Sequence, residues 1–329
     1  MTQREYINDR LTTLRKISVL NGYSVLYLLV SYGLARLFHG ADFNEFCSFH
    51  MYDLGNRKRA EYLTIGRCRK LLNTVFNRNA SQEDVAKLSY KSNFNKNYSS
   101  FIHRDWLYIP DSTPEDIRAF VERNPKFLVK TSYGTWGNDI HLMELDNLDF
   151  DAFLQQYGDK PYLLEAFIRQ HPAMSEPNPS SVNTVRMITA RLNDRILLVG
   201  CGLRVGGGGQ FVDNYNHGGV AYPIDLETGI VSGPGQNPHG TESFLRHPST
   251  GHIMPGFRIP HWELLKQEAC RAALVSDRVG YTGWDIAVTE DGVEFIEGNV
   301  RLPGTCVIQL SGPGAYQRLK DFIAGSPGV

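Results

Sequence analysis

Two carboxylates and an amide late in the chain have the types and spacing of a magnesium site. Asp285 lies on one apolar run, Glu297 and Asn299 lie on or just after the next, and the turn dipeptide Asp291-Gly292 lies between them. In a hairpin centred on that dipeptide, Asp285 lies opposite residue 298, beside Glu297 and Asn299, which project from one face. Oxygen ligands of this kind bind Mg²⁺ alongside nucleotide phosphates. We therefore predict that these three side chains bind magnesium.

The alternative for this hairpin is an exposed turn that happens to carry acidic residues. Asp285, however, lies between a tryptophan and an isoleucine, and Glu297 follows a phenylalanine and an isoleucine. Such neighbours are typical of a core strand. Acidic side chains are rarely buried unless they are paired or bind a metal. The neighbours therefore favour the metal site.

A glycine-bearing loop is the second candidate for nucleotide chemistry. Lys130 ends the apolar run 126–131, and Ser132, Gly134 and Gly137 follow it. Glycines let backbone amides approach phosphates closely, and a lysine supplies a point charge. The loop does not match the P-loop pattern, because no GK[ST] opens a helix. An ordinary hairpin connection explains the same residues, so phosphate binding depends on the loop occurring together with the metal hairpin.

Two arginines lie on a further predicted hairpin. The turn dipeptide Asn193-Asp194 separates β-rich runs that carry Arg186 and Arg204, and the same register rule places Asn183 opposite Arg204. Arginine is the usual bidentate partner of carboxylates and phosphates. We predict a functional role for Asn183 and Arg204. For Arg186 an ion pair with an acid inside the sheet is the alternative.

The elements that position these residues alternate irregularly between helices and hairpins. Residues 1 to about 80 are predicted to be mainly helical, and Thr113 with Pro114 is a typical helix start, with the helix running to about Asn124. Strands are predicted at 126–131, 140–145 and 162–168, and a helix at 261–275. Hairpins and helices without regular βαβ alternation indicate an α+β fold.

Composition excludes several classes of function. Lys plus Arg number 34 and Asp plus Glu 35, and no dense basic run occurs, so nucleic acid is not a predicted partner. The five cysteines are scattered without a CxxC pair, which is typical of a reducing compartment and not of disulfides or a zinc site. The first ten residues carry charges of both signs, unlike a secretory signal. We predict a cytoplasmic protein.

The uncharged segment 17–35 is the one stretch with a membrane-like composition. A spanning helix needs roughly 20 predominantly apolar residues. Asn21, Gly22, Ser24, Ser31 and Gly33 interrupt this one, and a charge follows directly. A buried helix or a peripheral membrane contact is therefore favoured over a spanning helix.

Taken in chain order, these features resemble the ATP-grasp superfamily. The resemblance runs from Lys126 to about Ile308 and comprises the strand lysine with its glycine loop, the segment LLEAFI with Glu165, the segment NTVR, the second arginine strand and the metal residues. The segment EGNVRLPGT is similar to the metal-binding end of D-alanine–D-alanine ligases, which read E-x-N-x-x-P-G. This chain has one extra residue before Pro303-Gly304, and Arg301 lies in the gap.

More closely, the chain resembles the sugar-transfer-associated ATP-grasp family, which is found among genes for surface polysaccharides. The segments that carry this resemblance are HPAMSEPNPSSVNTVR, GLRVGGGGQFVDNYNHGGV, IDLETG, GWDIAVTEDGVEFIEGN and, near the N-terminus, FCSFHMYDLGNRKRAEYLT. The resemblance implies an ATP-grasp fold of class α+β, in which two lobes clasp ATP. It implies an N-terminal mainly helical region at 1–109, a small lobe with the glycine lid loop at 110–170, and a large lobe with the metal hairpin at 171–329.

The resemblance also implies the nucleotide contacts. Lys130 and a lysine from the preceding region, for which Lys96 is the candidate, would contact the phosphates. The glycine loop would close over the γ-phosphate, and the backbone after the LLEAFI strand would hold the adenine. The implied nucleotide-binding residues are Lys96, Lys130, Ser132, Gly134, Gly137, Glu165, Ala166, Phe167, Ile168 and Asn183, and the implied Mg²⁺ ligands are Asp285, Glu297 and Asn299.

The implied reaction is ATP-dependent ligation of a carboxylate to an amine through an acylphosphate. Arg186, Arg204 and Arg301 are the candidates that would bind the carboxylate and the developing acylphosphate. The expected substrates are small: a sugar acid, amino acid or peptide intermediate of surface polysaccharide or secondary metabolism. A phosphotransferase without ligation and a nucleotide-binding regulatory protein of polysaccharide assembly remain alternatives. The oligomeric state stays open.

Overall fold

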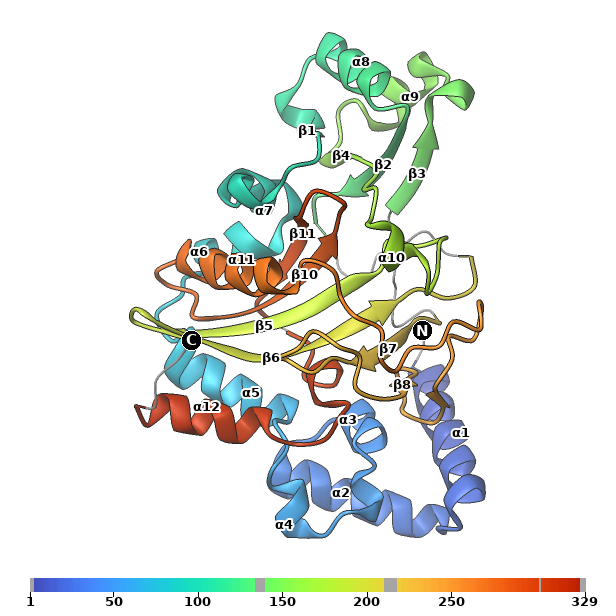
Figure 1. Ribbon diagram of the computed structural model, residues 1–329, viewed down its shortest axis with the longest axis vertical. Helices are drawn as coiled ribbons and strands as arrows, with labels where there is room; N and C mark the ends of the chain where they lie inside the picture. Colours follow the sequence, from blue (N-terminus) through green and yellow to red (C-terminus); the bar gives the residue numbers. More distant parts are fainter. Residues whose placement is uncertain (1–2, 134–139, 210–217, 302, 326–329) are drawn as a thin grey trace.

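The computed structural model describes residues 3–133, 140–209, 218–301 and 303–325, and it shows two antiparallel sheets with helices around them. A helical N-terminal region lies at one end of the molecule, a seven-stranded sheet in the middle and a four-stranded sheet at the other end (Figure 1). The predicted class, α+β with an N-terminal mainly helical region, is confirmed. The division at residues 109 and 170 stays a prediction.

The N-terminal region consists of short helices. They are α1 (Gln3–Asn21), α2 (Val25–His39), α3 (Phe43–Ser48), α4 (Asn56–Arg59), α5 (Ile65–Leu71), α6 (Gln82–Ser89) and α7 (Lys91–Asn97). The uncharged segment 17–35 is divided between α1 and α2, because Gly22 adopts a φ of 76° and Ser24 caps α2 by accepting from the Tyr27 N–H. In the described part of the chain no one helix has the length and apolar composition to cross a bilayer. Residues 7–21 and α2 meet that test only together, with axes 113° apart.

The four-stranded sheet has the order β1-β4-β2-β3, and two helices cover it. Its elements are β1 (Trp106–Tyr108), α8 (Pro114–Arg123), β2 (Lys126–Thr131), β3 (Ile140–Glu144), α9 (Phe150–Tyr157) and β4 (Tyr162–Ala166). Helix α8 begins as predicted, with Thr113 in a capping box and Pro114 in the first turn, and ends at Asn124. Buried residues of both helices and of β2 form the core of this lobe.

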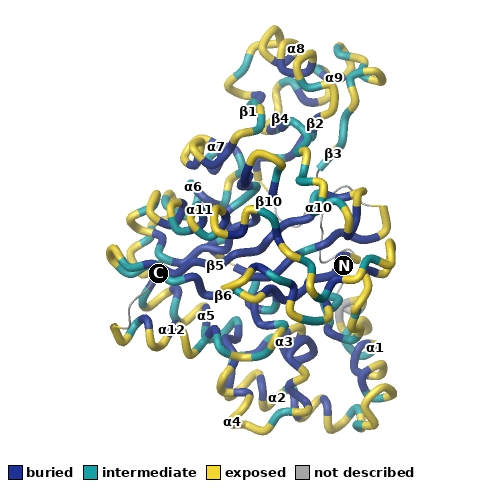
Figure 2. The backbone as a smooth tube through the Cα atoms, viewed as in Figure 1, coloured by how far each residue is buried: buried dark blue, intermediate teal, exposed yellow. Residues whose placement is uncertain are grey.

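The seven-stranded sheet has the order β11-β10-β5-β6-β7-β8-β9. Its elements and the helices after β4 are α10 (Pro172–Ser175), β5 (Thr184–Leu192), β6 (Arg195–Val205), β7 (Val220–Pro223), β8 (Gly235–Gln236), β9 (Ser243–Phe244), α11 (Trp262–Leu274), β10 (Tyr281–Val288), β11 (Val293–Asn299) and α12 (Ala315–Ile323). Met187 packs in the cluster that contains α11, whereas its neighbour Ile188 packs in the cluster that contains α5 and α12. Helices therefore cover both faces, and the strands between them are buried (Figure 2).

Both predicted hairpins of this sheet form, but their registers differ from the predicted ones. In β10–β11 the Thr289 N–H donates to the Gly292 carbonyl, so the turn lies one residue earlier than predicted. A bulge between Asp285 and Ile286 then places Asp285 opposite Glu297, not residue 298. In β5–β6 a bulge between Ile188 and Thr189 places Thr184, not Asn183, opposite Arg204. A register counted from a turn fails by one residue at each bulge.

Candidate active site

The structure brings together the three predicted magnesium ligands. Asp285 on β10 lies directly opposite Glu297 on β11, and Asn299 lies two residues further along the same strand. The Asn299 amide nitrogen lies 3.2 Å from Glu297 Oε1 and 3.5 Å from Asp285 Oδ2. Asp285 is 4% exposed, and Glu297 and Asn299 are half-buried. The three side chains therefore converge on one face of the hairpin.

Two of the predicted catalytic arginines bind Asp285. Arg186 on β5 is its cross-strand neighbour and donates two hydrogen bonds to it, from Nε to Oδ1 at 2.5 Å and from Nη2 to Oδ2 at 2.9 Å. Arg204 on β6 adds a third, Nη1 to Oδ2 at 2.9 Å. The alternative kept open for Arg186, an ion pair inside the sheet, describes this arrangement. Arg186 also donates through Nη1 to the Pro303 carbonyl at 2.9 Å.

The two facing carboxylates have opposite pKa shifts. Burial opposes ionisation of Asp285, but the charges of Arg186 and Arg204 outweigh it and hold the pKa of Asp285 well below its usual range. Desolvation raises the pKa of Glu297, and the negative charge of Asp285 raises it further, while the charge of Lys91 acts the other way. A cation placed between the two carboxylates would relieve their repulsion.

The donor set fits Mg²⁺. Two carboxylates and an amide supply hard oxygen atoms, and Asn299 can present its oxygen after a half-turn of its amide group. In the described ranges, no cluster of three or more His, Cys, Asp or Glu side chains could hold a metal ion. The site therefore depends on Asn299 as its third protein donor. Asp285 could join it only by sharing its oxygens with Arg186 and Arg204.

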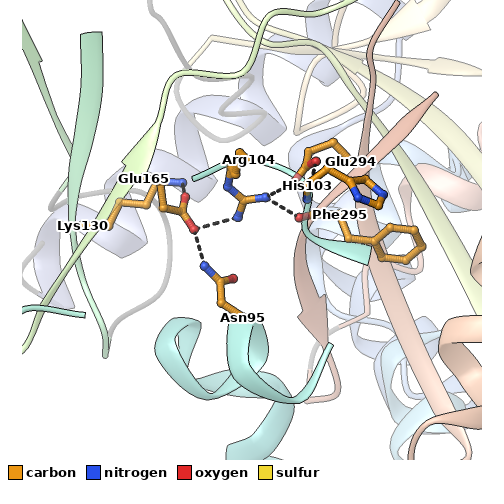
Figure 3. Close-up of polar contacts among 7 residues, drawn as sticks. All are labelled: Asn95, His103, Arg104, Lys130, Glu165, Glu294 and Phe295. Carbon is orange, nitrogen blue, oxygen red and sulfur yellow. Dashed lines mark hydrogen bonds and ion pairs between the residues drawn. The ribbon is translucent and has the colours of Figure 1, made fainter. Parts of the chain in front are cut away.

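A second buried ionic cluster links the two sheets (Figure 3). Lys130 Nζ on β2 lies 2.5 Å from Glu165 Oε2 on β4, and Arg104 Nη2 lies 2.7 Å from Glu165 Oε1. Arg104 also pairs through Nη1 with Glu294 on β11 and donates to the Phe295 carbonyl. Burial opposes ionisation of Glu165, but Arg104 and Lys130 hold its pKa well below its usual range. Arg104 thereby connects the small sheet to β11, which carries the predicted metal ligands Glu297 and Asn299.

Sequence reasoning found Lys130 and Glu165 but missed their partners. Asn95 donates to Glu165 Oε1 at 2.9 Å, and the His103 N–H donates to Glu294 Oε2 at 2.9 Å. The available signal was Glu294 itself, because a glutamate in an apolar strand next to Phe295 requires a buried cation. Nothing in the sequence identifies Arg104 as that cation, since it lies in an irregular segment far from the hairpin.

The start of the predicted lid loop contacts α7. The hydroxyl of buried Ser132 lies 2.7 Å from that of Ser92, and the Lys91 N–H donates to the Ser132 carbonyl at 3.1 Å. Gly134 and Gly137 lie outside the described residues. Lys91 is half-buried and close enough to Glu297 for its charge to lower the pKa of that carboxyl.

The structure does not place Lys96 with this cluster. Its Nζ lies 2.5 Å from Asp111 Oδ2 at the surface and 5.5 Å from the centre of the Tyr108 ring. Residues five apart on a helix project about 140° from one another, so Lys91 and Lys96 face different sides of α7. Lys91 is therefore the lysine that the preceding region brings to the metal residues.

Asn183 and Arg301 also lie apart from the metal residues. Asn183 is fully buried, and its amide donates to the carbonyls of Met174 and Asn178 at 2.7 and 3.0 Å and accepts from the Ser181 hydroxyl at 2.7 Å. It organises the loop before β5. Arg301 is exposed, two residues after Asn299, and no contact within the described ranges joins it to the cluster.

The predicted adenine-binding backbone lies at the connection between the lobes. The N–H of Ala166 donates to the Asp105 carbonyl at 2.9 Å and that of Phe167 to the Lys126 carbonyl at 3.2 Å, so the protein itself uses both groups. Ala166, Phe167 and Ile168 line a cavity of about 600 Å³ together with residues of α11 and the β10–β11 turn. None of Lys130, Asp285, Glu297 and Asn299 lines it, so we do not equate this cavity with the phosphate site.

A known family matches most of this chain. The family described as "Sugar-transfer associated ATP-grasp" matches residues 93–324, which include both ionic clusters and leave out α1 to α6. No curated protein matches the sequence.

Several solved structures are similar, at low identity. The chain is 12% identical to carboxyaminoimidazole ribonucleotide synthase from Aspergillus clavatus, with 70% of this chain and 49% of that one covered and a TM-score of 0.43. The ATP-grasp ligase PsnB with a minimal precursor gives 14% identity, coverage of 76% and 63%, and a TM-score of 0.45. D-alanyl-alanine synthetase A from Vibrio cholerae gives 13% identity, coverage of 65% of this chain and 55% of that one, and a TM-score of 0.41. The chain spans about half the length of the first of these proteins.

Proposed function

Because the chain belongs to the Sugar-transfer associated ATP-grasp family, we propose that it is an ATP- and magnesium-dependent carboxylate–amine ligase. ATP-grasp enzymes are typically ADP-forming ligases. The observation that carries the proposal is the facing pair of Asp285 and Glu297, with Asn299 beside them. Arg186 and Arg204 donate hydrogen bonds to Asp285. Such a face offers oxygen ligands for a cation and positive groups for an anionic substrate at one place.

Each group has a separate task in this proposal. Asp285, Glu297 and Asn299 would hold Mg²⁺, which neutralises phosphate charge when bound. Lys130 and Lys91 supply positive charge from the small lobe and from α7, and Lys130 would exchange part of its contact with Glu165 for a phosphate. Arg186 and Arg204 would orient the substrate carboxylate and stabilise the charge that develops on transfer.

The reaction needs no protein nucleophile. A carboxylate oxygen of the substrate attacks the γ-phosphorus of ATP, the bond to the β-phosphate oxygen breaks, and ADP leaves with an acylphosphate formed. The amine nitrogen of the second substrate then attacks the acyl carbon, phosphate leaves, and the amine proton passes to solvent. Positioning and charge neutralisation supply the rate enhancement in transfers of this kind.

We propose small-molecule substrates and a cytoplasmic setting. The family description associates its members with sugar transfer. We propose as the substrate a sugar acid, amino acid or peptide intermediate of surface polysaccharide or secondary metabolism. All five cysteines are free, as expected where thiols stay reduced and ATP is abundant.

The test is an ADP-release screen with pooled uronic acids and amino acids in the presence of Mg²⁺. ADP, free phosphate and a new amide in one reaction support ligation. A stable phosphorylated product would instead show a phosphotransferase, and ATP binding without substrate-dependent turnover would show a regulatory protein. The variant Glu297→Ala should abolish ADP release. The control Glu290→Ala changes an exposed acid on the turn of the same hairpin and should leave release unchanged.

A further inference from the structure

The outward face of α2 is the largest concentration of exposed apolar side chains among the described residues. Seventeen large hydrophobic side chains are exposed across the described residues, and nine of them lie between residues 19 and 38. Those nine are Val19, Leu20, Leu26, Tyr27, Leu29, Val30, Leu34, Leu37 and Phe38, and we call them the α2 patch. Leu26 is 73% exposed and Leu37 is 76% exposed. A patch of this kind marks an interaction surface.

The patch is the outer side of a helix that is already folded onto its own region. The inward residues Leu28, Ser31, Ala35 and His39 are buried, whereas Leu26, Leu29, Leu37 and their neighbours recur at helical spacing on the opposite side. Arg59 on α4 holds α2 in place, because its Nη2 donates to the Ser31 hydroxyl at 2.7 Å. A helix that is apolar on both sides is typical of one that is covered on both sides.

The shape and charge of this end of the molecule favour a flat anionic partner. Helices α2 and α4 form the end of the molecule that lies furthest from the small sheet (Figure 1). Most positions of α2 other than Leu28, Ser31, Ala35 and His39 are exposed (Figure 2). Exposed cations flank it: Arg15 on α1, Arg36 within α2, and Arg57 and Lys58 on α4. Asp53 and Glu61 lie beside Tyr23 and Lys58, respectively, and α1 carries the further exposed acids Glu5 and Asp9.

We propose that the α2 patch docks on the surface of an anionic phospholipid bilayer. The 15-residue helix, about 22 Å long, would lie in the plane of the interface with Leu26, Leu29 and Leu37 among the acyl chains. Arg36, Arg57 and Lys58 would reach the headgroups, and a surface of this sign attracts each basic residue near it. The axes of α1 and α2 lie 113° apart and their inward faces are buried, which fits a surface contact and not a span.

Docking would leave the proposed active site accessible. The Asp285 group lies on strands β5, β6, β10 and β11, and the Arg104 cluster joins β11 to the small sheet. Helix α2 lies at the far end of the N-terminal region (Figure 1). The helical region is also joined to the loop after the metal ligands, because the Thr305 hydroxyl donates to Glu45 Oε1 at 2.6 Å and the Gln309 amide donates to the Leu63 carbonyl at 2.9 Å. This contact with a membrane goes beyond the ligase activity and does not depend on it.

The experiment is flotation of the full chain with vesicles of phosphatidylcholine alone or mixed with phosphatidylglycerol. The protein should float with the mixed vesicles, and added salt should weaken its binding. The double variant Leu26→Gln/Leu37→Gln should bind at least about 10-fold more weakly. Arg57→Glu/Lys58→Glu should lower binding to the mixed vesicles only. The matched control Leu245→Gln/Ile253→Gln changes two exposed apolar residues far from α2 in the sequence and should bind as the parent does.

Two results would overturn the proposal. One is the absence of binding to either kind of vesicle by the folded parent protein. The other is a dimer, measured by light scattering, that Leu26→Gln/Leu37→Gln separates without any effect on vesicles, since the patch would then bind a second copy. Circular dichroism checks that each variant is folded, and the positions are exposed enough for polar substitution. Vesicle binding needs no turnover, so failure here leaves the ligase test unaffected.

Discussion

The Arg104 cluster, which links the two sheets, and the Asp285–Glu297 pair on the seven-stranded sheet differ in how their charges are balanced. Glu165 is 2% exposed and contacts both Lys130 and Arg104, and its pKa lies below the usual range. Glu297 is half-buried and faces another carboxylate, Asp285, and its pKa lies above the usual range. In the Arg104 cluster, Arg104 and Lys130 neutralise Glu165. In the other group Arg186 and Arg204 bind Asp285, and Glu297 keeps a repulsion from Asp285 that a bound cation would remove.

This difference separates a structural role from a functional one. Buried charges that satisfy one another hold elements in place, and removing one partner leaves the other uncompensated. Carboxylates that are held together against their repulsion are typical of sites that bind metals or transfer protons. We therefore expect substitutions in the Arg104 cluster to lower stability and substitutions at Glu297 to lower activity.

The largest effect is expected for Glu297→Gln. The substitution keeps the shape of the side chain but removes one of the two charged ligands of the proposed metal site, so ATP-dependent ADP release should fall about 1,000-fold. The free energy of unfolding in urea should stay equal or rise, because a carboxylate repelled by Asp285 has been neutralised. A Glu297→Gln variant that unfolds more easily and keeps its activity would show that Glu297 has a structural role and not a functional one.

The next effect concerns Arg104→Met. Glu165 and Glu294 would both remain buried without the cation that they share, and Lys130 would still pair with Glu165. The free energy of unfolding should fall by about 3 kcal/mol or more. Urea denaturation measures the loss.

Two controls sharpen the Arg104 prediction. The double variant Arg104→Met/Glu294→Met should recover part of the stability, because it also removes a stranded charge. Arg123→Met breaks a surface pair with Asp105, in which the arginine side chain is 60% exposed, and should change stability little. Equal losses of unfolding free energy for Arg104→Met and Arg123→Met would contradict a structural role for the buried Arg104 cluster.

A third buried carboxylate extends the comparison to a group without a paired cation. Burial, together with the charge of Asp42, raises the pKa of Glu45 from its usual 4.5 to about 7, although the Thr305 hydroxyl donates to it. Between these values the folded state binds more protons than the unfolded state, so stability falls as pH rises from about 4.5 to about 7. The contribution is up to about 3 kcal/mol. Urea denaturation at several pH values should show this slope, and Glu45→Gln should remove it.

Much of the fold could be predicted because its signals are local. The cap at Thr113, the turn at Asn193-Asp194 and the apolar runs that became β2, β5 and β10 depend on residues adjacent in sequence. The registers were not predicted correctly, because the β10–β11 turn lies one residue earlier than its turn dipeptide indicates and because the bulges at Asp285 and Ile188 shift the pairing without a sequence marker.

The candidate site could be predicted in part for the same reason. Asp285, Glu297 and Asn299 lie on one hairpin, so their meeting follows from strand geometry. Arg104 meets Glu294 across 190 positions of the chain, and only the tertiary fold brings them together. The role predicted for Asn183 rested on a position opposite Arg204, which the bulge in β5–β6 changes. Asn183 instead donates to the Met174 carbonyl and stabilises the loop before β5.

The smallest expected effect distinguishes the two lysines of α7. Lys91 lies beside Ser132 and near Glu297, whereas Lys96 pairs with Asp111 at the surface. Lys91→Met should weaken binding of a non-hydrolysable ATP analogue about 10-fold, as expected for the loss of one charged phosphate contact. Lys96→Met is the matched control and should bind as the parent does. Calorimetric titration with Mg²⁺ measures both. If Lys96→Met lost the affinity instead, α7 would have to rotate when the nucleotide binds. Lys96, and not Lys91, would then contact the phosphates.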